Sequence, residues 1–388
     1  HRDLHSFPTR RSSDLQNLLT SLNAKKANGP DQLPIRILKE TATEIAPLLQ
    51  IIYMASLRQG TVPKDWRSAN VVPVFKKGDR LSAANYRPIS LTSLCCKVLE
   101  HIIYKHIMSH CEKHKILVDF QHGFRKSRFC ETQLITVREE IAKWRDDGHN
   151  VDMLIMDFSK AFDKVPHRCL LNKLESYGID GSLGSWLKHW LTTRTQTVIL
   201  DCEASSPVKV KSGVPQGTVL GPLMFLLYIN DIGTNINHSR VKLFADDCLL
   251  YKIVNNKEDE TELQDDLTKL QHWADKWQMS FNIKKCFLLS VRKKGHQITS
   301  QYKIYGKILE AVEHHPYLGV ELQSNLKWDH HINQITGKAN RSLAFLRRNL
   351  SRCPEQTKER AYVALVRPHV EFASAVWDPH LKKDIREV

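Results

Sequence analysis

Two adjacent aspartates, Asp246 and Asp247, interrupt an apolar stretch and are the residues of this chain best suited to chemistry. The flanks, residues 241–243 and 248–251, are typical of strands, so we expect the pair at the turn of a hairpin. Adjacent carboxylates repel each other, and a bound divalent cation such as Mg²⁺, which prefers carboxylate oxygen, would relieve that repulsion. Aspartate also occurs at turns for backbone reasons alone, so the pair by itself leaves both interpretations open.

A third carboxylate, Asp157, ends a nearly continuous apolar run over residues 151–156, which is typical of a buried strand. If that strand and the hairpin are neighbours in one sheet, the three carboxylates converge. Such a site can hold two metal ions about 3.5–4 Å apart, which clamp the attacking and leaving oxygens of a phosphoryl displacement. Positioning and charge neutralisation supply most of the catalysis in that reaction.

The composition favours a polyanionic partner. The 388 residues carry a net charge of +15, which favours nucleic acid over an anionic membrane, with a solvated basic surface as the alternative. The nine cysteines are odd in number and include no Cys-x-x-Cys pair, which argues against a disulfide framework or a zinc module. No apolar run approaches the ~18–20 residues of a membrane span, so we expect no membrane partner.

Residues 1–15 lack any apolar period and back-translate to a string that resembles a common sequencing-library adapter. We expect these residues to be a disordered assembly artefact, with a genuine basic tail as the alternative. The chain lacks an initiator methionine, so we also expect it to be a fragment.

Strand and helix patterns mix without regular alternation, which predicts an α+β fold rather than a doubly wound one. We expect helices over residues 45–57, 94–108, 132–144, 183–191, 332–350 and 355–372, and short strands over 71–75 and 317–320. Pro73 predicts an edge position for the strand over 71–75. A helical stripe over residues 263–277 predicts a helix packed on a sheet.

An ordered set of motifs identifies a family. The set comprises Lys26-Ala27-Asn28-Gly29-Pro30-Asp31, Asn85-Tyr86-Arg87-Pro88-Ile89-Ser90-Leu91, Gln121-His122-Gly123-Phe124-Arg125, Asp157-Phe158-Ser159-Lys160-Ala161-Phe162-Asp163, Ser212-Gly213-Val214-Pro215-Gln216-Gly217-Thr218-Val219-Leu220-Gly221-Pro222, Phe244-Ala245-Asp246-Asp247 and Tyr317-Leu318-Gly319-Val320. In this order they resemble the reverse transcriptase of non-LTR (LINE-type) retrotransposons, close to the jockey-like group. The resemblance covers residues 16–388.

The resemblance implies a right-hand polymerase fold of fingers, palm and partial thumb, with an antiparallel palm sheet packed on helices. Residues 16–150 would form the fingers and an N-terminal extension. Residues 151–325 would form the palm, with a fingers-side insertion near 165–210. Residues 326–388 would form a truncated thumb.

The resemblance also implies roles for individual residues. Asp157 and Asp246 would be ligands of two Mg²⁺ ions, with Mn²⁺ as an alternative, and Asp247 would complete the acidic site. Phe162 matches the aromatic residue that lies under the incoming sugar and excludes a 2′-hydroxyl, and its alternative is a core aromatic. Gln216 would contact the incoming nucleotide.

Further nucleotide contacts would come from other motifs. Gly217, like Gly213, would let the backbone approach template and nucleotide, with plain turn formation as the alternative. Phe158 belongs to the nucleotide site. Arg87 would bind the triphosphate through its guanidinium, and Lys77 is a candidate for the same role or a solvated turn lysine. Lys285 would lie near the leaving pyrophosphate, with Lys284 as an alternative.

Nucleic-acid contacts would come from three regions. Arg125 would contact template or support the fingers. Tyr317, Leu318 and Gly319 would belong to the hairpin that grips the primer end. Basic side chains of the last helices would track backbone phosphates, namely Lys338, Arg341, Arg347 and Arg348. Asp163 is expected to be structural, beside Asp157. The pairs His314-His315 and His330-His331 have no cysteine or carboxylate at ligand spacing, so we expect structural or surface roles for them.

The predicted activity is RNA-templated extension of a DNA 3′ end with deoxynucleoside triphosphates. Template RNA and primer DNA would be the partners, and a separate endonuclease domain, absent here, is expected in the full-length protein. Family analogy predicts action in both cytoplasm and nucleus. The alternative is a decayed or truncated element that binds nucleic acid without catalysis.

Overall fold

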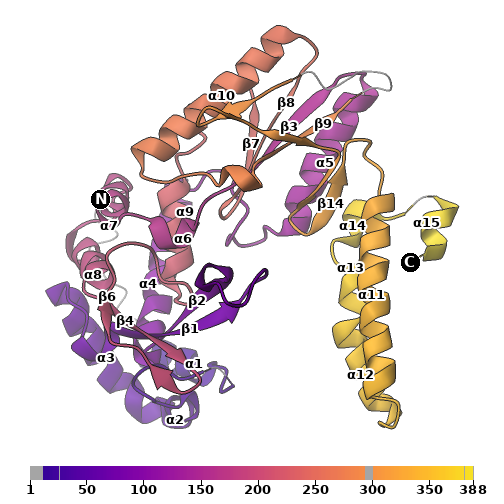
Figure 1. The fold of residues 1–388 in the computed structure, drawn as a ribbon. Coiled ribbons are helices and arrows are strands. Elements are labelled where there is room, and N and C mark those ends of the chain that lie inside the picture. Colours follow the sequence, from indigo (N-terminus) through magenta and orange to yellow (C-terminus); the bar gives the residue numbers. More distant parts are fainter. Residues whose placement is uncertain (1–11, 26, 293–299, 380, 388) are drawn as a thin grey trace. The chain divides into compact units, whose positions relative to one another are not determined.

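The chain forms two compact units, which we describe separately (Figure 1). The computed structural model describes residues 12–25, 27–292, 300–379 and 381–387. Unit 1 is drawn from residues 1–118, 160–232 and 275–279, and unit 2 from residues 119–159, 233–274 and 280–388. Neither unit is one continuous segment. The motif residue Lys26 lies outside the described residues.

Unit 1 is mainly helical. Its helices are α1 (Ser12–Thr20), α2 (Ile35–Glu40), α3 (Ala42–Gln59), α4 (Leu94–Lys113), α6 (Ala161–Lys164), α7 (His167–Ser176), α8 (Gly181–Thr192) and α9 (Leu220–Ile229). Helix α9 is apolar on all sides, and such a helix must be covered all round. It is buried along almost its whole length and contacts α4 and α7.

The sheet of unit 1 is built around β1 (Ser68–Phe75). This strand pairs antiparallel with β2 (Tyr86–Thr92) and parallel with β4 (Thr195–Leu200), which also pairs with β5 (Glu203–Ala204) and β6 (Val208–Lys209). The predicted edge position of this strand is therefore wrong. The pairing with β4 ends at Val71, however. At Pro73 no strand of the described residues pairs with that side of β1, so the missing backbone N–H of the proline costs no hydrogen bond there.

Unit 2 contains the sheet that carries Asp157. Its order is β12 (Glu310–Val312), β9 (Phe287–Val291), β3 (Val151–Asp157), β8 (Asp247–Ile253) and β7 (Arg240–Phe244). The pairings are antiparallel except for β12 with β9. Because β3 lies in the middle and is covered on both faces, its sequence is an apolar run rather than an alternating one.

Helices cover both faces of this sheet. Alternate residues of β3, beginning with Val151, pack with α5 (Cys130–Asp146) and with the hairpin of β13 (His314–Tyr317) and β14 (Val320–Gln323). Figure 1 shows α10 (Lys257–Lys276) on the other side of the sheet from α5. The predicted α+β class, with an antiparallel sheet packed on helices, is confirmed.

The remaining elements are short or belong to the C-terminal helices. They are the 3₁₀ turns Lys64–Trp66, Ala83–Asn85 and Ile283–Lys285, strands β10 (Lys303–Ile304) and β11 (Lys307–Ile308), and helices α11 (Asp329–Asn349), α12 (Glu355–Leu365), α13 (Arg367–Glu371), α14 (Ser374–Trp377) and α15 (Lys382–Glu387). The helix expected over 355–372 is thus two helices. Among helices of the described residues, none has the length and apolar character that a bilayer crossing requires.

The expected domain boundaries stay predictions. Residues 1–11 lie outside the described residues, and residues 12–15 belong to the start of α1, in which Leu15 is buried. The boundary expected after residue 150 falls inside unit 2, where α5 packs on the sheet. Residues 317–320 form the turn of a hairpin rather than a strand.

Candidate active site

The structure brings the predicted carboxylates to one corner of the unit 2 sheet. Asp157 at the end of β3 lies directly opposite Asp247, the first residue of β8. Asp247 also pairs with Phe244 of β7, so Asp246 lies in the tight turn between the two strands. Directly opposite residues of an antiparallel pair project from the same face. The strand that ends at Asp157 and the hairpin of Asp246 and Asp247 are thus neighbours in one sheet, as expected. The role of these residues as metal ligands stays a prediction.

A lysine already compensates part of the charge at this corner. The Nζ of Lys285 lies 2.6 Å from Oδ2 of Asp157, and both side chains are partly exposed. The carbonyl of Asp157 accepts a hydrogen bond from the backbone N–H of Asn282 at 2.8 Å, which fixes the loop that carries the lysine. Lys284 is exposed, so Lys285 is the better placed of the two candidates.

The donor set at this corner suits Mg²⁺. Carboxylate oxygens are its preferred protein ligands, and Mg²⁺ usually keeps several water or substrate oxygens as well. In the part of the chain that the structure describes, the three aspartates do not bring their oxygens within 4.8 Å of one another. In this arrangement the three carboxylates do not together surround one ion, so a metal held by some of them would take its further ligands from water or phosphate.

A buried glutamine that sequence reasoning missed holds the turn beside Asp246. Ala245 adopts φ +54°, a conformation that side chains with a Cβ rarely adopt. The Gln121 side chain, 1 % exposed, accepts from the Ala245 N–H at 3.0 Å and donates to its carbonyl at 3.3 Å. A Cβ on Gly123 would lie 2.3 Å from the Ala245 nitrogen. The motif Gln121-His122-Gly123 was the signal that could have identified this clamp.

Two predicted residues near this corner have supporting roles. The Phe158 side chain is 2 % exposed and stacks on Phe281 at 4.2 Å between ring centroids. The expected contribution of Phe158 to the nucleotide site stays a prediction, and burial of the ring would leave its backbone for such a contact. The Arg125 guanidinium lies 3.5 Å from the Gln121 carbonyl and 4.0 Å from the Asp119 carboxylate, contacts that favour support over template binding.

The predicted nucleotide residues of unit 1 form a hydrogen-bonded group. Gln216 Nε2 donates to Asp163 Oδ1 at 3.0 Å, and the Gln216 carbonyl accepts from the Ser90 N–H at 2.7 Å. Asp163 is structural as expected, but it orients Gln216. Gly217 has φ +96°, and a Cβ there would lie 2.8 Å from the Ser90 oxygen, so this turn requires glycine. Phe162 is half-buried and stacks on Phe225 at 4.4 Å between ring centroids.

A cavity of about 280 Å³ lies beside this group within unit 1. Asp163, Gln216, Arg194, Lys209 and Lys211 are among its lining residues. The Arg194 side chain is 2 % exposed, and its two terminal nitrogens have no hydrogen-bond partner among the described residues. A lone arginine in the short connection between α8 and β4 carries no sequence signal, so this residue was missed.

Arg87 and Lys77 are exposed and lie outside the lining of that cavity. Arg87 is on β2 opposite Val74, and Lys77 follows β1 in a turn. Their predicted contacts with triphosphate stay predictions.

The predicted primer-gripping segment is the turn of the β13–β14 hairpin. Leu318 and Gly319 have φ values of +48° and +89°, the backbone that a two-residue hairpin turn needs. The Tyr317 side chain is 2 % exposed, and its hydroxyl accepts from Gln133 Nε2 at 2.6 Å. The Tyr317 side chain therefore anchors the hairpin in the core, and the expected grip of this hairpin on a primer end stays a prediction.

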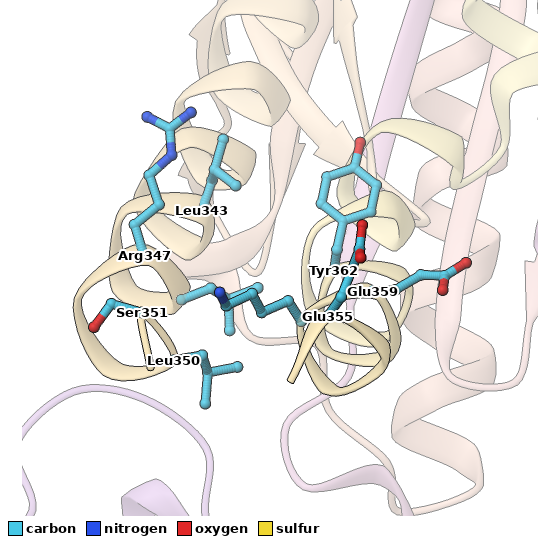
Figure 2. A pocket seen from close by; sticks show the side chains of 9 residues that line it. Leu343, Arg347, Leu350, Ser351, Glu355, Glu359 and Tyr362 are labelled. Atoms are coloured by element: carbon cyan, nitrogen blue, oxygen red, sulfur yellow. The ribbon is translucent and has the colours of Figure 1, made fainter. Parts of the chain in front are cut away.

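The four predicted basic residues of α11 are all exposed but do not share one face. Since each helical residue turns by about 100°, Lys338, Arg341 and Arg348 lie on one side of α11 and Arg347 lies roughly opposite Lys338. Arg347 instead lines an apolar groove of about 520 Å³ between α11 and α12, with Leu343, Leu350 and Tyr362 (Figure 2).

Comparisons with known proteins show the family of this chain. A family model described as reverse transcriptase (RNA-dependent DNA polymerase) matches residues 74–322. The probable RNA-directed DNA polymerase from transposon BS of Drosophila melanogaster is 29% identical over 400 residues, which cover 97% of this chain and 43% of that protein.

Two further matches are similar in kind. The RNA-directed DNA polymerase from mobile element jockey of Drosophila melanogaster is 28% identical over 83% of this chain and 36% of that protein. The chain thus spans about two fifths of these relatives. Among solved structures, apo telomerase from Candida tropicalis, truncated from the C-terminal domain, has a TM-score of 0.48 at 12% identity, covering 76% of this chain and 60% of that one.

Proposed function

Because the chain belongs to the reverse transcriptase (RNA-dependent DNA polymerase) family, we propose that it extends a DNA 3′ end on an RNA template during retrotransposition. The resemblance to jockey-like non-LTR retrotransposon polymerases is confirmed by the matched relatives. The observation that carries the proposal is the register that sets Asp157 opposite Asp247 beside the turn of Asp246.

The acidic corner would hold the metal and the neighbouring side chains would position the substrates. Two Mg²⁺ ions, or Mn²⁺, held by Asp157, Asp246 and Asp247 would neutralise charge on the transferred phosphoryl group. Gln216, fixed by Asp163, would orient the incoming nucleotide. Lys285 would stabilise charge on the leaving pyrophosphate, as a cation beside the acidic corner can.

The proposed substrates and partners are template RNA, primer DNA and deoxynucleoside triphosphates. An endonuclease domain of the full-length protein would supply the primer end, and the enzyme would act in the nucleus after assembly in the cytoplasm. The second candidate function is nucleic-acid binding without catalysis, which the basic face of α11 would support by itself.

Primer extension on an RNA template with Mg²⁺ tests the proposal. Asp246→Ala should abolish incorporation, whereas Asp146→Ala, an exposed aspartate at the end of α5 in the same unit, should leave it unchanged. Incorporation that survives Asp246→Ala would refute the site. Salt-sensitive binding of a primer–template duplex by the wild type without any incorporation would favour the binding-only alternative.

A further inference from the structure

Two histidines lie beside one buried carboxylate in unit 2. The sequence offers His314-His315 and His330-His331 with no acidic residue at ligand spacing, which predicted structural or surface roles. The fold supplies the missing carboxylate for His314 and His330, because β14 brings Glu321 to them.

Three ligand atoms from three elements converge at this point. The Nδ1 of His314, on β13, lies 2.9 Å from Oε1 of Glu321, on β14. The Nε2 of His330, in the first turn of α11, lies 3.9 Å from the same oxygen. All three ligand atoms are within 4.8 Å of one another, and the two imidazole centroids are 3.9 Å apart. Metal–ligand bonds of about 2.0–2.2 Å require separations of this size.

The surroundings of the Glu321 carboxylate are unusual for a buried acidic group. Its side chain is 5% exposed, and within the described residues its ion-pair partners are His314 and His330, with no lysine or arginine. A buried carboxylate is normally paired with a charge or coordinated to a metal. The two histidines are 47% and 41% exposed, so the side of the cluster away from Glu321 is open to water.

The backbone that carries Glu321 is also held in place. The backbone N–H of Glu321 donates to Nδ1 of His331 at 3.2 Å, and His331 is buried against Trp377 at 5.2 Å between ring centroids. These contacts fix the position of β14 at Glu321 relative to the start of α11.

We propose that His314, Glu321 and His330 bind a divalent transition metal of the zinc class. Two imidazole nitrogens and one carboxylate oxygen suit Zn²⁺ and its neighbours Co²⁺ and Ni²⁺, whereas Mg²⁺ prefers oxygen ligands. Water would complete the coordination on the exposed side. The metal ties the β13–β14 hairpin to the start of α11, so its binding stabilises this junction.

Metal titration of the metal-free chain tests the proposal without reference to polymerase activity. Excess Mg²⁺ occupies the aspartate corner, Co²⁺ serves as the spectroscopic probe and Zn²⁺ as the competitor. We expect one Co²⁺ per chain with a visible spectrum of nitrogen and oxygen ligands, displaced by one Zn²⁺. His314→Ala and His330→Ala should each lower affinity by more than the ~10–100-fold typical of losing a supporting residue.

The matched control is His114→Ala. His114 is exposed and its ring lies 4.6 Å from that of His110, so it belongs to another histidine pair, and the described residues place no carboxylate in a ligand group with it. The control should bind metal as the wild type does. His314→Ala and His330→Ala both change partly exposed side chains. Adding Zn²⁺ should therefore raise the melting temperature of the wild type and of His114→Ala, but not that of these two variants.

Three results would overturn the proposal. One is unchanged affinity in both His314→Ala and His330→Ala. Another is an equal loss in His114→Ala, which would indicate non-specific binding to surface histidines. The third is a Co²⁺ spectrum with thiolate charge-transfer bands, which would place the ion on cysteine instead.

Discussion

At the scale of single residues, the turn that carries Asp246 depends on the Gln121 side chain. Gln121→Leu keeps the volume but leaves the Ala245 N–H and carbonyl without their partner in a buried place. Such a loss costs about 1–3 kcal/mol. We expect the free energy of unfolding, measured in urea, to fall by this amount, and Gln301→Leu at an exposed site to change it little. Equal stability of both variants would contradict the clamp.

Sugar selection belongs to the same scale. Phe162 is fixed by stacking on Phe225, so its half-exposed ring has one orientation. If this ring excludes the 2′-hydroxyl, Phe162→Ala should shift the ratio of kcat/KM for deoxynucleotides over ribonucleotides by at least about tenfold toward ribonucleotides. The control is Phe345→Ala, an exposed phenylalanine on α11. Unchanged sugar selectivity in Phe162→Ala would exclude the gate.

At the scale of elements, the two sides of α11 should differ in their contact with nucleic acid. Lys338→Glu with Arg341→Glu reverses two charges on the proposed phosphate-tracking side. Arg347→Glu with Lys358→Glu makes the same change in net charge at the groove between α11 and α12. For a primer–template duplex, the first pair should lower the slope of log K against log salt by about 1.4–1.8, because each lost phosphate contact removes roughly 0.7–0.9.

The control pair should leave that slope unchanged, as measured by fluorescence anisotropy over a series of salt concentrations. Equal effects of the two double variants would mean that net charge alone decides binding. In that case no side of α11 would track phosphates.

Helices and strands are predictable where their pattern is local. Contacts between distant residues are harder to predict, because they depend on how strands pair. The apolar run of β3 and the helical stripe of α10 arise from local periodicity, so the sequence alone predicts both. The register of Asp157 with Asp247 joins residues far apart in the chain, and only their meeting in one sheet was expected. Glu321 approaches His314 and His330 because residues 317–320 form a hairpin turn, whereas the sequence pattern predicts a strand there. Burial of Phe158 and Tyr317 was missed because a motif gives position along the chain and not orientation.

At the scale of the whole molecule, buried thiols should make the protein lose stability in alkali. Burial raises the pKa of Cys286 to about 11 and the pKa of Cys248 further, whereas a thiol in the unfolded chain titrates near 8.5. Between about pH 9 and 11 the folded state therefore keeps protons that the unfolded state has lost. The free energy of unfolding falls as pH rises through this window, by up to about 1.4 kcal/mol per pH unit for each such thiol.

One buried group acts in the opposite direction. Burial lowers the pKa of Lys173 to about 8 despite its ion pair with Asp231, so between pH 8 and about 10.5 the unfolded chain binds the extra proton. The effect of Lys173 on the pH dependence of the unfolding free energy cancels that of one thiol. The combined effect of Cys286 and Cys248 is therefore larger than that of the lysine. We expect urea unfolding to show a net decline from pH 9 to 10.5, and Cys286→Ala to make that decline shallower. A stability that stays level or rises over this range in the wild type would show that the thiols ionise in the folded state, against their burial.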